Sequence, residues 1–234
     1  RAAESGVSRI MMPNVDHETI DDMLEAELRY EGMCKPMMGL HPCSVGKDFE
    51  KALYVVEDLL KQRRFSAVGE IGTDLYWDRT YWAHQQEAFR IQMKWAEEFD
   101  LPAVIHCRDS IDETIDLAQG LGRSSDRGIF HCFSGSVDQA RTVVDMGFSI
   151  GIGGVATFKN GRLDDVLREV PLEHMVLETD SPYLAPEPNR GKRNEPSYLP
   201  LIAEKIARVK EVPADEVITV TSKNCMRIFG LNEA

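Results

Sequence analysis

Four side chains with metal-binding chemistry each stand at the end of a short apolar run. Glu70 ends FSAVGE, His106 ends PAVIH, His131 ends GIFH and Asp180 ends MVLETD. Imidazole nitrogens and carboxylate oxygens together suit zinc, manganese or iron-like divalent ions, while magnesium prefers oxygen ligands alone and is a less natural occupant. One histidine at such a place is usually an ordinary loop residue. Four side chains at equivalent places predict a metal site.

Several neighbours of these side chains could assist them. Side chains alternate in direction along a strand, so Glu178 faces the same side as Asp180 and could orient a metal ligand or accept backbone hydrogen bonds. The same alternation turns Cys107 and Cys132 away from the adjacent histidines, and we interpret both as small core residues. His41 also ends an apolar run, in GLHP, and could contact substrate or metal or stabilise the following turn.

A repeating pattern of strands and helices positions these residues. Apolar runs with strand character occupy 7–12, 35–40, 65–71, 102–107, 128–133, 148–154 and 175–180. The segments between them have helical spacing, as in 48–62, and two further helices are expected on either side of Pro213. Strands joined by helical crossovers are parallel and covered on both faces, which leaves a doubly wound sheet or a (β/α)8 barrel.

The spacing of the strands favours the barrel. No Gly-x-Gly-x-x-Gly follows the first strand, which weakens a dinucleotide-binding fold. Strands recur about every thirty residues, so eight units would reach the roughly 250 residues typical of a (β/α)8 TIM barrel. Only seven strands are visible, and RAAESG at the start looks like the end of a helix. We therefore expect residues 1–234 to form one barrel domain without its first strand, with a seven-stranded or distorted barrel as the alternative.

The carboxyl ends of barrel strands form one rim, where active sites are found. We therefore expect the four metal-binding candidates to meet there. Basic residues also follow strand ends: Arg108, Lys159, Arg162, Arg190, Lys192 and Arg193. Each could be ordinary solvated surface, but their common placement suits phosphate capture. The aromatic residues of segment 76–82 could stack on bases, although aromatics at this spacing more often pack a loop onto a helix, the interpretation we favour.

Composition restricts the class of protein. The 234 residues are 43% hydrophobic and can bury one substantial core. No run approaches the ~18 apolar residues needed to cross a bilayer. The formal net charge of -12 repels a polyanion at long range, so nucleic acid would have to be held locally. Five cysteines without a C-x-x-C pair argue against a disulfide framework and favour the cytoplasm.

Six motifs together resemble the TatD family of metal-dependent nucleases. They are GEIGTDLYWD (69–78), IHCRDS (105–110), FHCFSG (130–135), ETDSPYLAP (178–186), RGKRNEP (190–196) and NCMRIFGL (224–231), and the similarity spans nearly the whole chain. The resemblance implies an amidohydrolase-type barrel that uses two divalent ions, Mg, Mn or Zn, and metal-activated water. Its expected substrate is DNA, either single strands or 3′ ends, which the enzyme would shorten from the 3′ end. We expect no membrane association and no obligate protein partner.

The resemblance also implies roles for the four candidates. Glu70 would bridge two metal ions, and His106 and His131 would bind one of them. Asp180 would bind the other ion and accept a proton from the attacking water, so Glu70 and Asp180 are the expected catalytic residues.

Substrate contacts are implied beside the metal site. His41 and the loop from Arg190 to Arg193 match positions expected near the scissile phosphate. Together with Arg108, they are the candidates for substrate binding.

One departure separates the chain from the family pattern. The family opens with a strand that ends in His-x-His and supplies two further ligands, and no such motif occurs here. Truncation would explain both this gap and the missing strand. The chain would then complete one metal position and only partly furnish the other.

Two other functions stay open. The same barrel could hydrolyse a small ester, amide or lactone, since one fold hosts many chemistries. It could also be a catalytically incomplete barrel that acts as a binding protein, for which the missing His-x-His is the best support. The basic RGKRNEP loop favours the nuclease, because a small neutral substrate does not require a basic rim.

Overall fold

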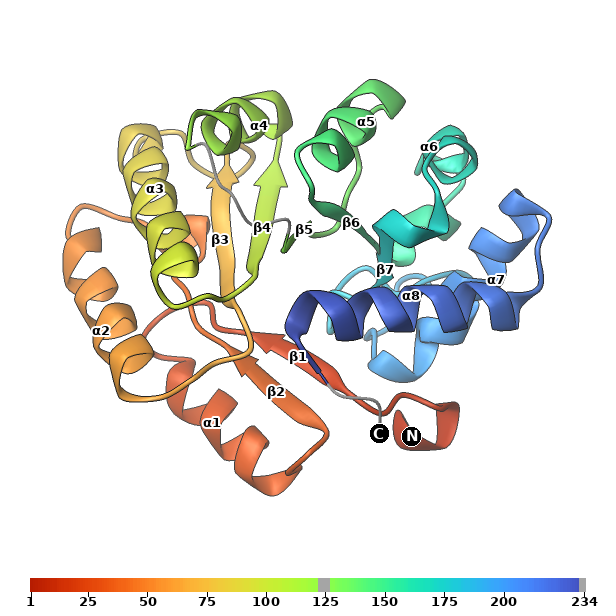
Figure 1. The fold of residues 1–234 in the computed structure, drawn as a ribbon, viewed down its shortest axis with the longest axis horizontal. Helices are drawn as coiled ribbons and strands as arrows, with labels where there is room; N and C mark the ends of the chain where they lie inside the picture. Colours follow the sequence, from red (N-terminus) through yellow and green to blue (C-terminus); the bar gives the residue numbers. More distant parts are fainter. Residues whose placement is uncertain (122–126, 232–234) are drawn as a thin grey trace. The chain divides into compact units, whose positions relative to one another are not determined.

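The computed structural model describes residues 1–121 and 127–231, and strands and helices alternate along them. The strands are β1 (Ile10–Pro13), β2 (Cys34–Met37), β3 (Val68–Asp74), β4 (Ala103–Arg108), β5 (Gly128–Phe130), β6 (Ser149–Ile152) and β7 (Met175–Leu177). The helices are α1 (Ile20–Arg29), α2 (Phe49–Gln62), α3 (Trp82–Glu98), α4 (Ile111–Gly120), α5 (Val137–Asp145), α6 (Asp164–Glu169), α7 (Leu199–Lys210) and α8 (Ala214–Phe229) (Figure 1). The expected order of strands and helices is confirmed.

Two compact units make up the chain. One comprises residues 9–129, and the other comprises residues 1–8 together with 130–234. The boundary falls within β5. The expectation of a single domain over residues 1–234 stays a prediction.

In the unit of residues 9–129, parallel strand pairs are covered by amphipathic helices. Strand β1 pairs with β2, and β3 pairs with β4, in both cases in parallel. Helix α2 buries Phe49, Leu53, Val56 and Leu60, the one-sided spacing expected from the sequence. Each such side chain contributes about 1.5–3 kcal/mol on burial. Helix α3 lies against both α2 and β3 (Figure 1).

Strand β3 is longer than the sequence predicted. The apolar pattern ends near Glu70, but the strand continues to Asp74 with all of its residues buried. Its register with β4 shifts between Gly69 and Ile71, and the Gly69–Glu70 peptide is cis. The placement of Glu70 at a strand end was therefore wrong, because backbone pairing with β4 holds the following GTD residues in the strand despite their polar character.

Gly72 is required at the centre of this extension. It pairs with His106 in the β3–β4 register and has a φ of 144°. A Cβ atom at this position would overlap the carbonyl oxygen of His106. Glycine is the residue that permits both this backbone conformation and this close approach.

In the unit that contains residues 130–231, β6 pairs in parallel with β7, and α8 packs beside α7 and β7. Asn224 on α8 is buried and donates its amide group to the carbonyl oxygens of Leu172 and Met175, at 2.7 and 2.8 Å. This contact explains the polar residue inside NCMRIFGL, since it satisfies backbone groups at the start of β7.

Membrane-spanning character is absent from the described helices. Among residues 1–121 and 127–231, none of them combines the length and the apolar composition that a bilayer-crossing segment needs.

Candidate metal centre and substrate-binding residues

His106 lies between two carboxylates of the neighbouring strand. Its Nδ1 is 2.8 Å from Glu70 Oε1, and its Nε2 is 2.9 Å from Asp74 Oδ2. Glu70 and Asp74 are four positions apart on β3 and therefore point to the same side of the strand. His106 on β4 is in register with Gly72, midway between them. The parallel pairing of β3 with β4 thus places the imidazole between the two acids.

Asp74 is a member of this cluster that sequence reasoning missed. It is 1% exposed, and its Oδ1 accepts the backbone N–H groups of Tyr76 and Trp77 at 2.9 and 3.2 Å. Burial raises the pKa of Asp74, but the hydrogen bonds from His106 and from these two backbone groups outweigh burial and lower the pKa to about 2. Each oxygen of the Asp74 carboxylate thus has a hydrogen-bond partner, His106 for Oδ2 and two backbone N–H groups for Oδ1. Its same-side spacing from Glu70 in GEIGTD was the available signal.

The hydrogen bonds of His41 decide between its possible roles. Its Nδ1 accepts the backbone N–H of Cys43 at 3.1 Å, so it does stabilise the turn formed by the 3₁₀ helix η2 (Pro42–Ser44). A neutral imidazole has one acceptor nitrogen and one N–H, so the proton is on Nε2, which lies 3.5 Å from Glu70 Oε1. His41 is therefore arranged as a hydrogen-bond donor rather than as a metal ligand.

The donor set and its charge fit a divalent cation. The ligand atoms of Glu70 and His106 lie within 4.8 Å of each other and of a ring nitrogen of His41. The pKa of the Cys43 thiol is raised to about 12, first by burial and then by the nearby Asp74 and Glu70 carboxylates, whose negative charge a cation would offset. Glu70 and His106 Nδ1 are the pair suited to share an ion, because Asp74 can then accept the remaining ring N–H, as carboxylates commonly do beside metal-binding histidines.

The unit of residues 130–231 contains a second, similar arrangement. His131 follows β5 directly, and its Nδ1 is 3.1 Å from Glu178 Oε2. Glu178 Oε1 accepts the backbone N–H of Cys132 at 2.7 Å. The Nε2 of His131 is 3.9 Å from Asp180 Oδ1. The two alternatives considered for Glu178, orienting a ligand or accepting a backbone hydrogen bond, thus occur together, and the other ring nitrogen of His131 is left toward Asp180.

One detail of this arrangement differs from the sequence-based expectation, and a glycine on a neighbouring strand supports it. Strand β7 ends at Leu177, so Asp180 lies in the loop beyond it, with a left-handed φ of 56° that aspartate tolerates better than most residues. A Cβ atom on Gly151 would overlap Glu178 Oε2, so a glycine on β6 makes room for the carboxylate. Asp180 is thus positioned by loop backbone rather than by a strand.

The expectation that Cys107 and Cys132 are core residues was wrong. Both are only half-buried. Cys132 lies outside β5 with a φ of 46°, so the alternation of a strand does not apply to it. Its sulfur lies within 4.8 Å of ligand atoms of His131 and Glu178.

The predicted ligands thus occur in two groups, Glu70 with His106 in one unit and His131 with Asp180 in the other. Within each group, a further carboxylate that also accepts backbone N–H groups contacts the histidine. The expectation that the four residues form one centre stays a prediction.

The predicted substrate-binding arginines are exposed. Arg108 ends β4, and its guanidinium carbon is 3.7 Å from the centre of the Tyr76 ring. The guanidinium carbon of Arg190 is likewise 3.7 Å from the centre of the Phe158 ring.

The loop that contains Arg193 is held by its neighbour Asn194, a buried residue that sequence reasoning missed. The side-chain amide of Asn194 donates to the carbonyl oxygens of Thr179 and Tyr183, at 2.5 and 2.6 Å. Asn194 thereby anchors the basic loop to the segment that contains Asp180.

The aromatic residues of segment 76–82 divide into two pairs. Tyr81 and Trp82 are half-buried at the start of α3, as packing predicts. Tyr76 and Trp77 are exposed, so the packing interpretation was wrong for them. The reason is that hydrogen bonds to Asp74 hold their backbone and leave the rings outside the core.

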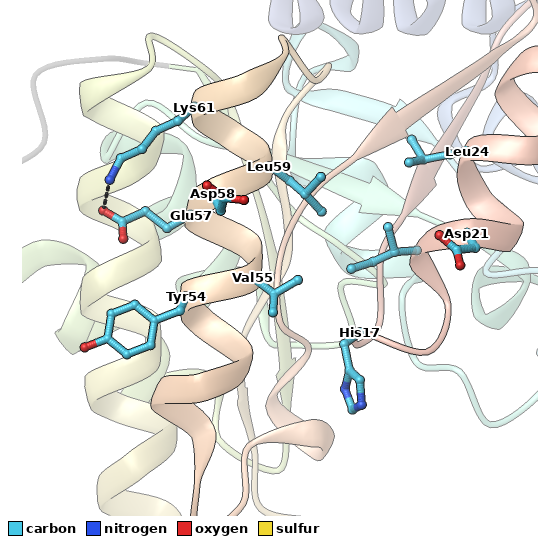
Figure 2. A pocket seen from close by; sticks show the side chains of 10 residues that line it. His17, Asp21, Leu24, Tyr54, Val55, Glu57, Asp58, Leu59 and Lys61 are labelled. Atoms are coloured by element: carbon cyan, nitrogen blue, oxygen red, sulfur yellow. Dashed lines mark hydrogen bonds and ion pairs between the residues drawn. The ribbon is translucent and has the colours of Figure 1, made fainter.

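A groove of about 720 Å³ lies between α1 and α2 (Figure 2). Its lining includes His17 just before α1, Asp21 on α1, and Tyr54, Glu57 and Lys61 on α2. Lys61 pairs with Glu57 at 2.8 Å, and none of the predicted metal or substrate residues borders the groove. Size alone therefore does not identify the chemical site.

Comparison with known proteins places the chain in a family. The family model described as TatD related DNase matches residues 1–230. The chain belongs to the TatD family. The uncharacterized metal-dependent hydrolase YabD of Bacillus subtilis is 36% identical over 233 residues, which cover 99% of this chain and 91% of the relative. TatD-family membership makes the chain a member of a family of metal-dependent hydrolases.

Two other TatD relatives bear on fold and substrate. The crystal structure of the TatD homologue YjjV of Escherichia coli matches with a TM-score of 0.92 and 30% identity, over 99% of this chain and 90% of that one. The predicted fold class, an α/β fold of the TIM-barrel type, is thereby confirmed. A Yersinia pseudotuberculosis protein named 3'-5' ssDNA/RNA exonuclease TatD is 31% identical over 240 residues, covering 99% of this chain and 91% of the relative.

Proposed function

We propose that this TatD-family protein is a nuclease that hydrolyses phosphodiester bonds of DNA from the 3′ end. The observation that supports it most is the pairing of each candidate metal-binding histidine with one ligand carboxylate and one orienting carboxylate, Asp74 for His106 and Glu178 for His131. The relative named 3'-5' ssDNA/RNA exonuclease supports a nucleic-acid substrate. The proposed cofactors are two divalent ions, with the mixed nitrogen and oxygen donors favouring zinc or manganese over magnesium.

The proposed ligands are Glu70, His106, His131 and Asp180. When bound, divalent ions would lower the pKa of water and neutralise charge that develops on the phosphoryl and leaving oxygens. Asp180 accepts the proton that the attacking water loses as its oxygen bonds to phosphorus. The bond to the leaving oxygen breaks, and that oxygen takes up a proton from solvent, to which Asp180 releases the proton it accepted. Asp74 and Glu178 hold the imidazole rings in the orientation that the ligands require.

The remaining candidates hold the substrate. His41 donates its Nε2–H to a phosphate oxygen, in agreement with the tautomer set by Cys43. Arg108, Arg190 and Arg193 pair with phosphates and position the backbone without reading its sequence. A cytoplasmic location stays a prediction from the odd cysteine number.

The test is a parallel assay of single-stranded DNA, RNA and a panel of small esters and lactones with manganese or magnesium. DNA shortening from the 3′ end that Asp180→Asn reduces by at least about a thousandfold would support the proposal. Unchanged turnover in Asp180→Asn would remove Asp180 from the mechanism. Hydrolysis of esters or lactones without attack on DNA would establish the alternative substrate class, and failure to bind any divalent ion would favour a binding protein.

A further inference from the structure

Tyr76 and Trp77 present adjacent aromatic rings directly after β3. Their exposed fractions are 51% and 70%, and the rings meet edge to face with centroids 4.9 Å apart. The guanidinium carbon of Arg108 lies 3.7 Å from the centre of the Tyr76 ring and 5.5 Å from that of Trp77. A scattered surface aromatic needs no explanation, but this trio offers a stacking face and a positive charge at one place.

The aromatic pair is tied to the candidate metal centre. One carboxylate, Asp74, accepts the backbone N–H groups of Tyr76 and Trp77 with Oδ1 and contacts His106 with Oδ2. Gln85 on α3 clamps the backbone of Asp74, accepting its N–H at 2.9 Å and donating to its carbonyl oxygen at 3.1 Å. The start of the aromatic segment is therefore held at a set place relative to the imidazole of His106.

A small pocket adjoins the same residues. It has a volume of about 180 Å³ and is lined in part by Trp77, Asp74 and the η2 turn that contains Cys43. Asp74 contacts His106, and Cys43 contacts His41, so the pocket borders partners of both histidines. A flat group stacked on Trp77 from this pocket would lie beside Asp74 and the η2 turn.

We propose that Trp77 stacks on a nucleobase of the single-stranded substrate, with the perpendicular Tyr76 ring at the edge of that base, while Arg108 pairs with a neighbouring phosphate. This inference rests on the proposed function and adds the residues that bind the base. A nucleotide has a flat base and an anionic phosphate. The base matches the exposed aromatic ring, and the phosphate matches the adjacent guanidinium group. The guanidinium stacks through its face, and its N–H edge can still pair with phosphate.

Stacking also addresses the charge of the protein. A chain with a net charge of -12 repels DNA at long range, so phosphate contacts alone give little affinity. Base–aromatic stacking does not depend on net charge and tolerates any sequence, which suits an enzyme that trims successive nucleotides. Stacking therefore offsets the loss of DNA affinity that the net negative charge of the protein causes.

The experiment compares two 5′-labelled oligothymidines, one intact and one whose 3′-terminal nucleotides lack bases. Binding is measured by fluorescence anisotropy in EDTA, and hydrolysis is measured with manganese. The variants of the full chain are Trp77→Ala, Trp77→Phe and, as a matched control, Tyr54→Ala, which removes a ring that is also 70% exposed but lies on α2. Trp77→Phe keeps an aromatic face and guards against loss of folding in Trp77→Ala.

Trp77→Ala is expected to weaken binding of the intact oligomer about tenfold and that of the abasic oligomer less than about twofold, with Trp77→Phe in between. Equal binding by Trp77→Ala and Tyr54→Ala, or an equal loss on both oligomers, would overturn the inference. Base-dependent binding through Trp77 without hydrolysis by the wild type would overturn the proposed function and leave the stacking site supported. Hydrolysis of DNA by the wild type, with binding and hydrolysis unchanged in Trp77→Ala, would overturn the stacking site and leave the proposed function supported.

Discussion

Asp74 Oδ2 lies 2.9 Å from His106 Nε2, while Glu70 contacts the other nitrogen of the same ring. The imidazole therefore has a different carboxylate at each nitrogen. Glu70 is suited to share a metal ion with His106, and Asp74 is suited to fix the ring. A residue with no direct contact to the ion can in this way control its binding.

Replacing Asp74 with Asn tests this division of roles. Asn can keep an oxygen for the N–H groups of Tyr76 and Trp77, but it loses the negative charge that stabilises the ring N–H of His106. We expect metal affinity to fall about 10- to 100-fold, measured by competition with a chelating dye. Asp116→Asn, an exposed site on α4, is the matched control. Equal affinities in the two variants would contradict the orienting role.

The lowered pKa of Asp74 predicts a pH dependence of stability in the metal-free protein. Folding lowers this pKa from 3.8 to about 2, so the stabilisation is complete above the unfolded pKa and is lost as the pH falls through the folded one. The wild type should exceed Asp74→Asn by about 2 kcal/mol in free energy of unfolding near neutral pH, and this difference should vanish between about pH 4 and pH 2. Urea unfolding in EDTA across this range measures it. A difference that does not vary with pH would refute the charge-based account.

The tautomer of His41 predicts separate effects on metal and on substrate. His41→Ala should reduce kcat/KM on single-stranded DNA by about 10- to 100-fold, the loss of a hydrogen bond to a charged group. Bound metal should stay within about twofold of the wild type, whereas His106→Ala should lose it. Metal content by mass spectrometry and steady-state kinetics give the two readouts. A loss of metal in His41→Ala that matches its loss of activity would make His41 a ligand.

Gly72 predicts an unusually large effect of adding one methyl group. Gly72→Ala would drive a Cβ atom into the carbonyl oxygen of His106 at a backbone conformation that alanine disfavours. We expect a loss of more than about 3 kcal/mol in free energy of unfolding, measured with urea. Gly120→Ala is the matched control, since nothing lies within 4 Å of its Cβ position, and it should be neutral or slightly stabilising. Similar free energies of unfolding for both variants would contradict the prediction, because they would mean that β3 and β4 can move apart at Gly72 without loss of stability.

The arrangement of elements was predictable because it is encoded locally. The apolar run and one-sided helical spacing of a segment such as 49–62 are visible within a dozen consecutive residues, and burial of that face favours the helix wherever it packs. The strands, the helices α2, α7 and α8, and the candidates Glu70, His106, His131 and Asp180 were all found from such patterns or from motifs. Errors arose where tertiary contacts override the local pattern, as in the extension of β3 to Asp74.

Residue types and motif spacing were sufficient to name the metal-binding candidates and the family they resemble. The partner of each imidazole was decided by folding, because contacts such as Asp74 with His106 depend on the register of two strands and on a glycine between them. The same holds for Trp77, whose exposure follows from backbone hydrogen bonds to a carboxylate that serves a second purpose. The sequence identifies the imidazole and carboxylate side chains, but only packing in three dimensions determines which nitrogen faces which oxygen.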